Sequence, residues 1–180
     1  MDRSPGRIVT LSADQGRRNF TLGQLHEDRW QVRLRTTNTD ENGVRLNKGL
    51  QALAKRDRER TRCRNSRMLA GSLALEQALL MAHRNAPLWD YAVGIHLQDG
   101  RDEVKWIEVH PASHSHLDEV LKKREWLRDW LRAAAPALAE LPREFIWVAS
   151  GKVMLPPGGQ HRRRLAQAGL RFAGERLRLD

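Results

Sequence analysis

The sequence of 180 residues contains a single cysteine, Cys63. One thiol cannot form an internal disulfide, and its isolation excludes a zinc module built from several cysteines. Arginines surround Cys63, an environment that can activate a thiol, but the sequence offers no neighbouring base or oxyanion feature. We therefore interpret Cys63 as incidental to function.

Long apolar runs are also missing. No stretch approaches the roughly 18 apolar residues that span a bilayer. The N-terminal residues MDRSPGR are not followed by the apolar region of a secretory signal. These absences disfavour transmembrane and secreted classes of protein and predict a cytoplasmic protein without a membrane partner.

Positive charge is abundant and unevenly placed. The formal net charge is +10, with 17 basic and 9 acidic residues in 1–86 against 15 and 13 in 87–180. Such an excess is typical of proteins that bind a polyanion, so we expect DNA or RNA as partner, alone or within a larger protein or ribonucleoprotein complex. The predicted nucleic-acid-binding residues lie in two clusters: Arg56, Arg58, Arg60, Arg62, Arg64 and Arg67 in the first, and Arg162, Arg163 and Arg164 in the second.

The length suits one domain with an appended segment. Residues 1–50 contain two short strand-like pieces, RIVTL and RWQVRLR, separated by polar and glycine-containing stretches. We expect a basic N-terminal extension or small β arm over 1–50 and the main domain over 51–180.

Hydrophobic periodicity predicts the elements of the main domain. We expect helices from about residue 47 into the charged stretch, over 66–84 and over 115–135. An antiparallel hairpin is expected over 90–98 and 103–110, since alternating runs flank Asp99-Gly100. A buried strand at REFIWVASG, a short basic helix at GGQHRRRLAQAGL and a final edge strand at RFAGERLRL complete the series. The predicted fold is α/β, with a central mixed sheet that contains this hairpin and is flanked by helices.

The hairpin brings three polar side chains together. If Gln98 pairs with about Glu103, Asp90 lies opposite about Pro111, close to Glu108 and His110. Two carboxylates at a strand end suit Mg²⁺, which prefers carboxylate oxygens and water. Glu76 projects from the apolar stripe of the expected helix 66–84. It is either a third acidic group near this site or a stripe-edge residue paired with an arginine.

The order of these motifs resembles the PD-(D/E)XK nuclease superfamily over roughly residues 66–150. The resemblance rests on a helix with Glu76, on Pro87 and Asp90 in PLWD, and on Glu108 in WIEVH. It implies a restriction-endonuclease-like fold and a nuclease in which Asp90 and Glu108 bind Mg²⁺ or Mn²⁺ and Glu76 supports them. The chain departs from the family pattern at His110, which stands where the family places a lysine. His110 could orient the attacking water, and Lys105, Lys122 or Lys123 could supply the missing charge.

Three alternatives remain open from the sequence. His110, His114 and His116 could form a zinc site with an open position. The domain could instead be a catalytically degenerate nuclease fold that acts as a nucleic-acid-binding or scaffolding subunit. A third class is a small protein-interaction module, such as a toxin or inhibitor, whose basic face meets an acidic protein.

Overall fold

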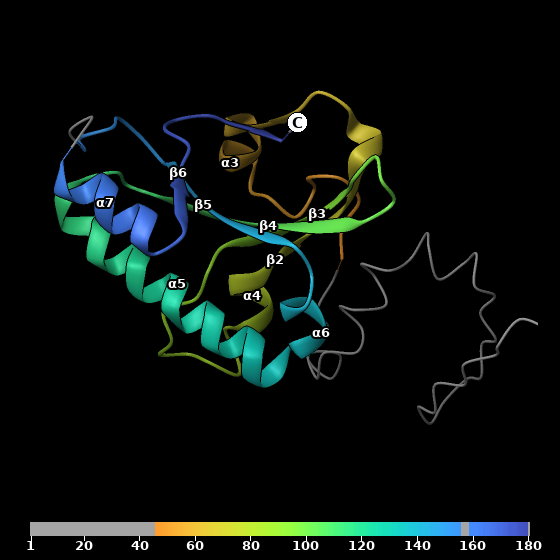
Figure 1. Ribbon diagram of the computed structural model, residues 1–180, viewed down its shortest axis with the longest axis horizontal. Coiled ribbons are helices and arrows are strands. Elements are labelled where there is room, and N and C mark those ends of the chain that lie inside the picture. Colours follow the sequence, from red (N-terminus) through yellow and green to blue (C-terminus); the bar gives the residue numbers. More distant parts are fainter. Residues whose placement is uncertain (1–45, 156–158, 180) are drawn as a thin grey trace, which may run out of the picture.

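Residues 46–155 and 159–179 are described by the structure, a computed structural model of the chain (Figure 1). The predicted N-terminal extension falls almost entirely outside these described residues. Within them no helix is both long and apolar enough to cross a membrane. The elements in chain order are α3 (Lys55–Arg60), β1 (Thr61–Cys63), the 3-10 turn η2 (Ser66–Met68), β2 (Leu69–Ala74), α4 (Leu75–Leu79), β3 (Tyr91–His96), β4 (Asp102–His110), α5 (His114–Ala134), α6 (Pro136–Ala139), β5 (Arg143–Ala149), α7 (Gln160–Gln167), β6 (Leu170–Phe172) and β7 (Leu177–Leu179).

A five-stranded mixed sheet forms the centre of the molecule, in the order β2-β3-β4-β5-β6. β2, β3 and β4 are antiparallel neighbours, whereas β4, β5 and β6 run parallel. Parallel neighbours need a crossover connection, and α5 with α6, and then α7, provide the two that occur here. The prediction of an α/β protein with a mixed sheet flanked by helices is confirmed.

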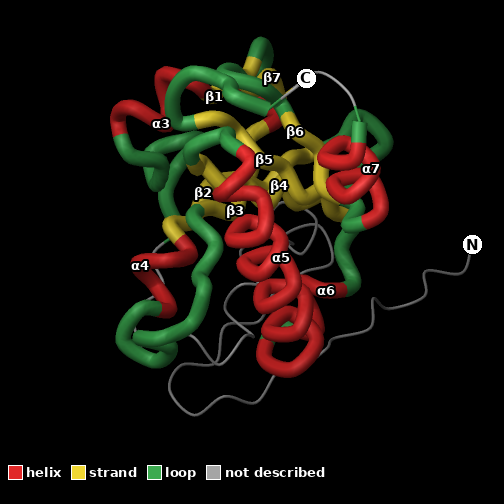
Figure 2. The backbone as a smooth tube through the Cα atoms, turned by 90° about the vertical axis from the view of Figure 1, so that its left-hand side faces the viewer, coloured by secondary structure: helices red, strands yellow, loops and turns green. Residues whose placement is uncertain are grey.

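The two faces of the sheet are covered differently. α4, α5, α6 and α7 lie on one face, and α3 lies on the other (Figures 1 and 2). On the α3 side, Leu177 and Leu179 of β7 pack with Leu53 against Val93 and Ile107 of the sheet. β7 pairs there with β1 in a separate two-stranded parallel sheet. The sheet is therefore buried on both faces, as its apolar strands predict.

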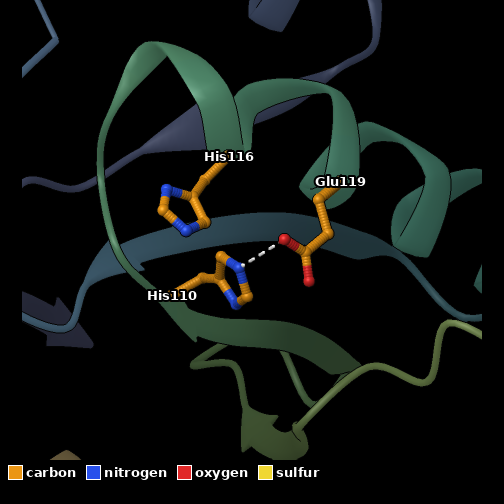
Figure 3. Close-up of side chains that lie close together, drawn as sticks. All are labelled: His110, His116 and Glu119. Atoms are coloured by element: carbon orange, nitrogen blue, oxygen red, sulfur yellow. Dashed lines mark ion pairs between the residues drawn. The ribbon is translucent and has the colours of Figure 1, made fainter.

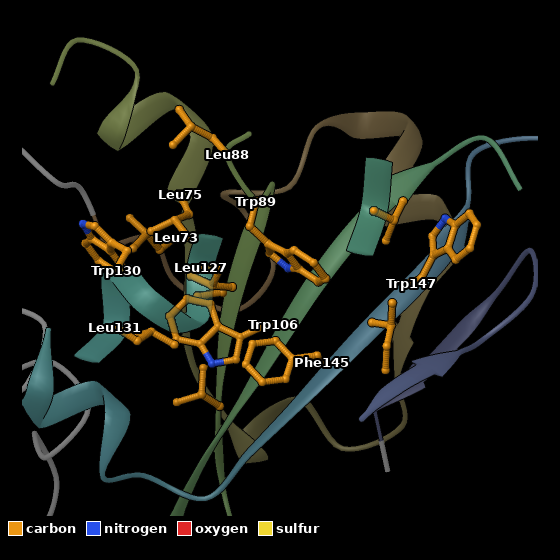
Figure 4. Packing of buried hydrophobic residues seen from close by; sticks show 14 of the residues in the cluster. Leu73, Leu75, Leu88, Trp89, Trp106, Leu127, Trp130, Leu131, Phe145 and Trp147 are labelled. Carbon is orange, nitrogen blue, oxygen red and sulfur yellow. The ribbon is translucent and has the colours of Figure 1, made fainter. Parts of the chain in front are cut away.

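The larger core lies between α5 and the sheet (Figure 4). Trp89, Trp106 and Trp147 are fully buried there. α5 faces them with one stripe of buried residues, namely Leu117, Val120, Leu127, Trp130 and Leu131. This spacing of three and four residues keeps a helix stripe on one side, so the predicted amphipathic helix 115–135 is confirmed.

The β3–β4 hairpin is confirmed, but the predicted register is wrong by three residues. Ile95, not Gln98, pairs with Glu103, and Tyr91 pairs with Ile107. The connection is longer than the Asp-Gly signal suggests, because the N–H of Leu97 donates to the carbonyl of Arg101 and closes a wider loop. The corrected register brings Asp90 opposite Glu108 rather than Pro111.

The predicted helix over 66–84 is wrong. Residues 69–74 form β2, which pairs with β3, and within 66–84 only Leu75–Leu79 are α-helical. The pairing is irregular between Leu69 and Gly71, and Gly71 has a φ of 147°. This bulge lets Leu69 pack on the α3 side while Leu73 packs on the α5 side. Leucines four apart therefore imitate a helical stripe in the sequence.

Two further corrections concern the ends of the described chain. The expected single edge strand over 171–179 is two short strands, β6 and β7, in different sheets. Gly174, with a φ of 72°, lies between them and permits the change of direction. The helix expected from about residue 47 begins only at Lys55.

Leu127→Ala is expected to lower the free energy of unfolding by about 2–5 kcal/mol, because it empties a fully buried position beneath the sheet. The matched control is Leu80→Ala, the same substitution at a side chain that is 48% exposed, for which a loss below about 1 kcal/mol is expected. Chemical denaturation of both variants measures the difference. Equal losses would contradict the assignment of the α5 stripe to the core.

Candidate active site

Asp90 and Glu108 meet at the open end of the β3–β4 hairpin. Asp90 directly precedes β3, and the register that pairs Tyr91 with Ile107 places it across from Glu108. The N–H of Asp90 donates to Oε2 of Glu108 at 3.2 Å. The N–H of Val109 donates in turn to Oδ2 of Asp90 at 2.8 Å. Backbone contacts thus hold both carboxylates in place on the face that α5 covers.

Lys123 of α5 approaches both carboxylates. Its Nζ lies 2.5 Å from Oε1 of Glu108 and 3.9 Å from Oδ1 of Asp90. Lys123 follows Val120 by three residues and precedes Leu127 by four, so it lies within the buried stripe of the helix. Its side chain is 13% exposed. The ammonium group is therefore a fixed cation beside two carboxylates.

Burial makes the charges of this group interdependent. Glu108 is fully buried. Burial, and after it the neighbouring charge of Glu108, raises the pKa of Asp90 to about 7. Burial alone would lower the pKa of Lys123, but the carboxylates of Glu108 and Asp90 outweigh it and raise that pKa. Asp90 and Glu108 thus share one ammonium group in a buried site, where ionisation of both carboxyl groups is less favourable than in water.

His110 lies on the other side of Glu108. Its Nδ1 is 3.4 Å from Oε1 of Glu108, and its Nε2 is 3.1 Å from Oε2 of Glu119. Glu108, and after it Glu119, raises the pKa of His110 against the opposing effect of burial. His110 stands where the resembled family places a lysine. Like a lysine, it contacts carboxylates.

Glu76 lies at the edge of this group. It is exposed in the first turn of α4, and its charge raises the pKa values of Asp90 and Lys123. Its backbone N–H approaches the carbonyl of Asp90 at 3.4 Å. The structure thus places Glu76 near the predicted site, although the helix that was expected to carry it is mostly strand.

The two arginine clusters lie on opposite faces of the sheet. Arg60 follows the exposed Arg56 and Arg58 in α3, and its Nη2 donates to the carbonyl of Ser150 at 2.6 Å. The N–H of Ser150 donates to the carbonyl of His110. Arg62, Arg64 and Arg67 are exposed further along the first cluster. The first cluster thus reaches the strand end that carries the candidate site.

The second cluster lies on α7, beside the beginning of α5 (Figure 1). Arg162 and Arg163 are exposed, whereas Arg164 forms an ion pair with Asp118 of α5. The ring of His161 packs against that of His114, with centroids 4.5 Å apart. The described ligand atoms that lie close together are those of His110, His116 and Glu119. The alternative zinc site of His110, His114 and His116 is therefore not brought together.

Two contributors were not identified as such from the sequence. The sequence offers Lys123 only as one of three lysines that could supply the missing charge, and does not place it beside Asp90 and Glu108. The available signal was its position in the apolar stripe, where a lysine requires a buried partner. Glu119 is the second, since its proximity to His110 depends on how α5 packs on β4.

Asp90→Asn is expected to stabilise the metal-free protein increasingly as the pH rises. Asp90 has a raised pKa in the folded state, so its contribution to stability is fully present below its unfolded pKa of about 3.9 and is lost as the pH rises through about 7. Asparagine removes this loss and retains the acceptor for Val109. Relative to wild type, we expect a gain of about 1–4 kcal/mol at pH 8 and little gain at pH 4.5.

Denaturation at both pH values, in the presence of a chelator, measures this difference. Asp129→Asn is the control, because Asp129 is exposed and its pKa is lowered by Arg132. A gain that is the same at both pH values would show that Asp90 is not held in the environment described.

The chain was compared with family models, with curated proteins and with solved structures. None of the three comparisons gives a match.

Proposed function

We propose that this chain is a divalent-cation-dependent phosphodiesterase that acts on nucleic acid, with a site of the PD-(D/E)XK type. One observation carries the proposal: Asp90 and Glu108 are paired across a hairpin, and both face the ammonium group of Lys123. The mixed sheet, with the hairpin followed by a crossover helix and a parallel strand, is consistent with a restriction-endonuclease-like fold.

The residues fit Mg²⁺ or Mn²⁺. The ammonium group of Lys123 contacts Glu108 and lies 3.9 Å from Asp90, so both carboxylates already face positive charge. Asp90 and Glu108 would hold the ion through hard oxygen ligands, with water or phosphate in the other positions. When bound, the ion supplies Lewis-acid polarisation of the phosphate and activation of water.

The other side chains have roles that follow from their positions. Lys123 supplies a permanent positive charge that favours the negative charge developing on the phosphate. His110 contacts the same oxygen of Glu108 as Lys123 does, and so helps to orient that carboxylate. Lys123 thereby has the role of the lysine that follows the second carboxylate in the PD-(D/E)XK pattern. Glu76 adds negative charge from the rim of the site.

The arginine clusters supply affinity for the substrate. The half-buried Arg60 of α3 contacts Ser150 after β5, and the half-buried Arg164 of α7 contacts Asp118 of α5; exposed arginines flank both residues. Phosphates contacted by both clusters would cross the edge where Asp90 and Glu108 lie. Such contacts position a polyanion without reading its sequence, so the proposal extends to nucleic acid generally.

Replacement of Arg56, Arg58 and Arg62 by glutamine is expected to weaken nucleic-acid binding and its salt dependence. Each lost phosphate contact should lower the slope of log K against log salt by roughly one unit. Fluorescence anisotropy with labelled DNA and RNA at several salt concentrations gives the slope. The control with the same change of charge replaces Arg101, Arg132 and Arg143, which are exposed at the hairpin turn, the end of α5 and the start of β5. Equal effects of the two triple variants would place the binding surface elsewhere.

A second candidate is a binding subunit without catalysis. The short contact between Lys123 and Glu108 favours it, because a lysine that neutralises a buried carboxylate can replace a metal as a structural partner. Such a protein would retain the arginine clusters and act within a larger nucleic-acid complex.

Cleavage assays separate the two candidates. The full chain is incubated with single-stranded and duplex DNA and RNA in Mg²⁺, in Mn²⁺ and in chelator. Cleavage that requires the divalent ion supports the phosphodiesterase. Salt-dependent binding of the same substrates without cleavage in either ion would support the binding subunit.

A further inference from the structure

A second group of potential metal ligands lies next to the carboxylate pair. It consists of His110 at the end of β4 and His116 and Glu119 in the first turns of α5. One ligand atom from each residue lies within 4.8 Å of the other two. The three side chains converge on one region between the strand and the helix (Figure 3).

Glu108 orients the ring of His110. Nδ1 of His110 faces Oε1 of the fully buried Glu108 at 3.4 Å. Nε2 points away from Glu108, toward Glu119, and is buried without a hydrogen bond of normal geometry among the described residues. A carboxylate behind a histidine fixes the tautomer with the proton on Nδ1 and leaves Nε2 as the metal ligand.

His116 is oriented in the same way from the helix side. Its Nδ1 lies 2.6 Å from Oγ of Ser113, the residue that precedes α5. Figure 3 shows a ring nitrogen of His116 directed toward His110. Since Nδ1 is engaged with Ser113, the nitrogen that remains for a ligand is Nε2. The rings of His110 and His116 are 5.2 Å apart and steeply inclined, so both can approach one ion edge-on.

Glu119 supplies the third ligand and a negative charge. Its Oε2 is 3.1 Å from Nε2 of His110, close to the separation of about 3.3 Å that neighbouring ligands have around tetrahedral zinc. Its side chain is 51% exposed, so it can adjust to complete a site and leaves one side open to solvent.

We propose that His110, His116 and Glu119 bind a transition-metal ion of the Zn²⁺ class with a fourth position open to water or a phosphate oxygen. Two imidazoles and one carboxylate suit such an ion and are a poor set for Mg²⁺, which prefers oxygen ligands. Glu108 links this site to Asp90, because it contacts His110 through one side and pairs with Asp90 through the other. The inference is independent of the proposed function, since it concerns binding of a metal and no cleavage.

The test is titration of the full, tag-free, chelator-treated chain with Co²⁺, followed by visible absorption. Tetrahedral Co²⁺ absorbs far more strongly than octahedral Co²⁺, so the spectrum distinguishes a histidine site from a carboxylate–water site. One equivalent is expected to give tetrahedral bands that Zn²⁺ abolishes. His116→Ala and Glu119→Gln, both at partly or largely exposed positions, should weaken Co²⁺ binding by at least about 10–100-fold.

Two control variants test whether Co²⁺ binds at His110, His116 and Glu119. His114→Ala removes a histidine two residues from His116 that packs on His161 instead, and should leave the bands unchanged. Asp90→Asn should also leave them, which separates this site from the proposed Mg²⁺ site. The absence of tetrahedral bands in wild type, or bands that persist in His116→Ala with unchanged affinity, would overturn the proposal whether or not the chain cleaves nucleic acid.

Discussion

Asp90→Asn and Glu108→Gln are each expected to lower the proposed metal-dependent cleavage of nucleic acid by about 10²–10³-fold or more, because each would remove a charged ligand from the proposed ion. Binding of the substrate should remain within about 2-fold of wild type, since neither substitution alters the arginine clusters. Initial rates of cleavage and anisotropy titrations on the same substrate measure the two effects.

The choice of substitutions separates catalysis from folding. Asp90→Asn is expected to be at least as stable as wild type at neutral pH, so its loss of activity would not reflect unfolding. Asp129→Asn, an exposed position near the end of α5, is the control and should retain full activity. Cleavage that survives both carboxylate substitutions would place the active site elsewhere in the chain.

Lys123→Ala is expected to lower the free energy of unfolding by about 3–5 kcal/mol, because it removes the ammonium group that contacts the fully buried Glu108. Lys122→Ala is the matched control: it removes the neighbouring lysine, which is exposed, and should cost less than about 0.5 kcal/mol. Urea denaturation in the presence of a chelator measures both values.

A rescue variant tests the cause of this loss. Glu108→Gln in the Lys123→Ala background removes the buried charge and keeps an acceptor for the N–H of Asp90. The double variant should regain most of the lost stability. If it does not, the loss in Lys123→Ala reflects the packing of the lysine stem rather than an unpaired carboxylate.

The hairpin and α5 could be predicted because their local patterns agree with their final environment. The strand-forming residues on both sides of Asp99-Gly100 mark β3 and β4, and the α5 stripe matches the core that it covers. The register of β3 with β4 is harder to predict, because it depends on how the loop after His96 closes through the hydrogen bond between Leu97 and Arg101. The predicted register is wrong by three residues, but it still places Asp90 near Glu108, because both residues lie at the end of the hairpin.

β2 could not be distinguished from a helix by spacing alone. Its leucines are separated by a bulge at Gly71, and its pairing with β3 joins residues about 20 positions apart. Such long-range pairing overrides local preference and leaves little trace in a single sequence. Lys123 shows a similar limit. The sequence places it in the apolar stripe of α5, but its carboxylate partners depend on how α5 packs on β4.

The central claim is that Asp90 and Glu108 bind one divalent cation beside Lys123. The most direct measurement is the anomalous difference density of crystals soaked in Mn²⁺. We predict a Mn²⁺ peak in direct contact with oxygens of both Asp90 and Glu108, and its loss in crystals of Asp90→Asn. Saturating Mn²⁺ that gives no peak there, or a peak only among His110, His116 and Glu119, would contradict the claim.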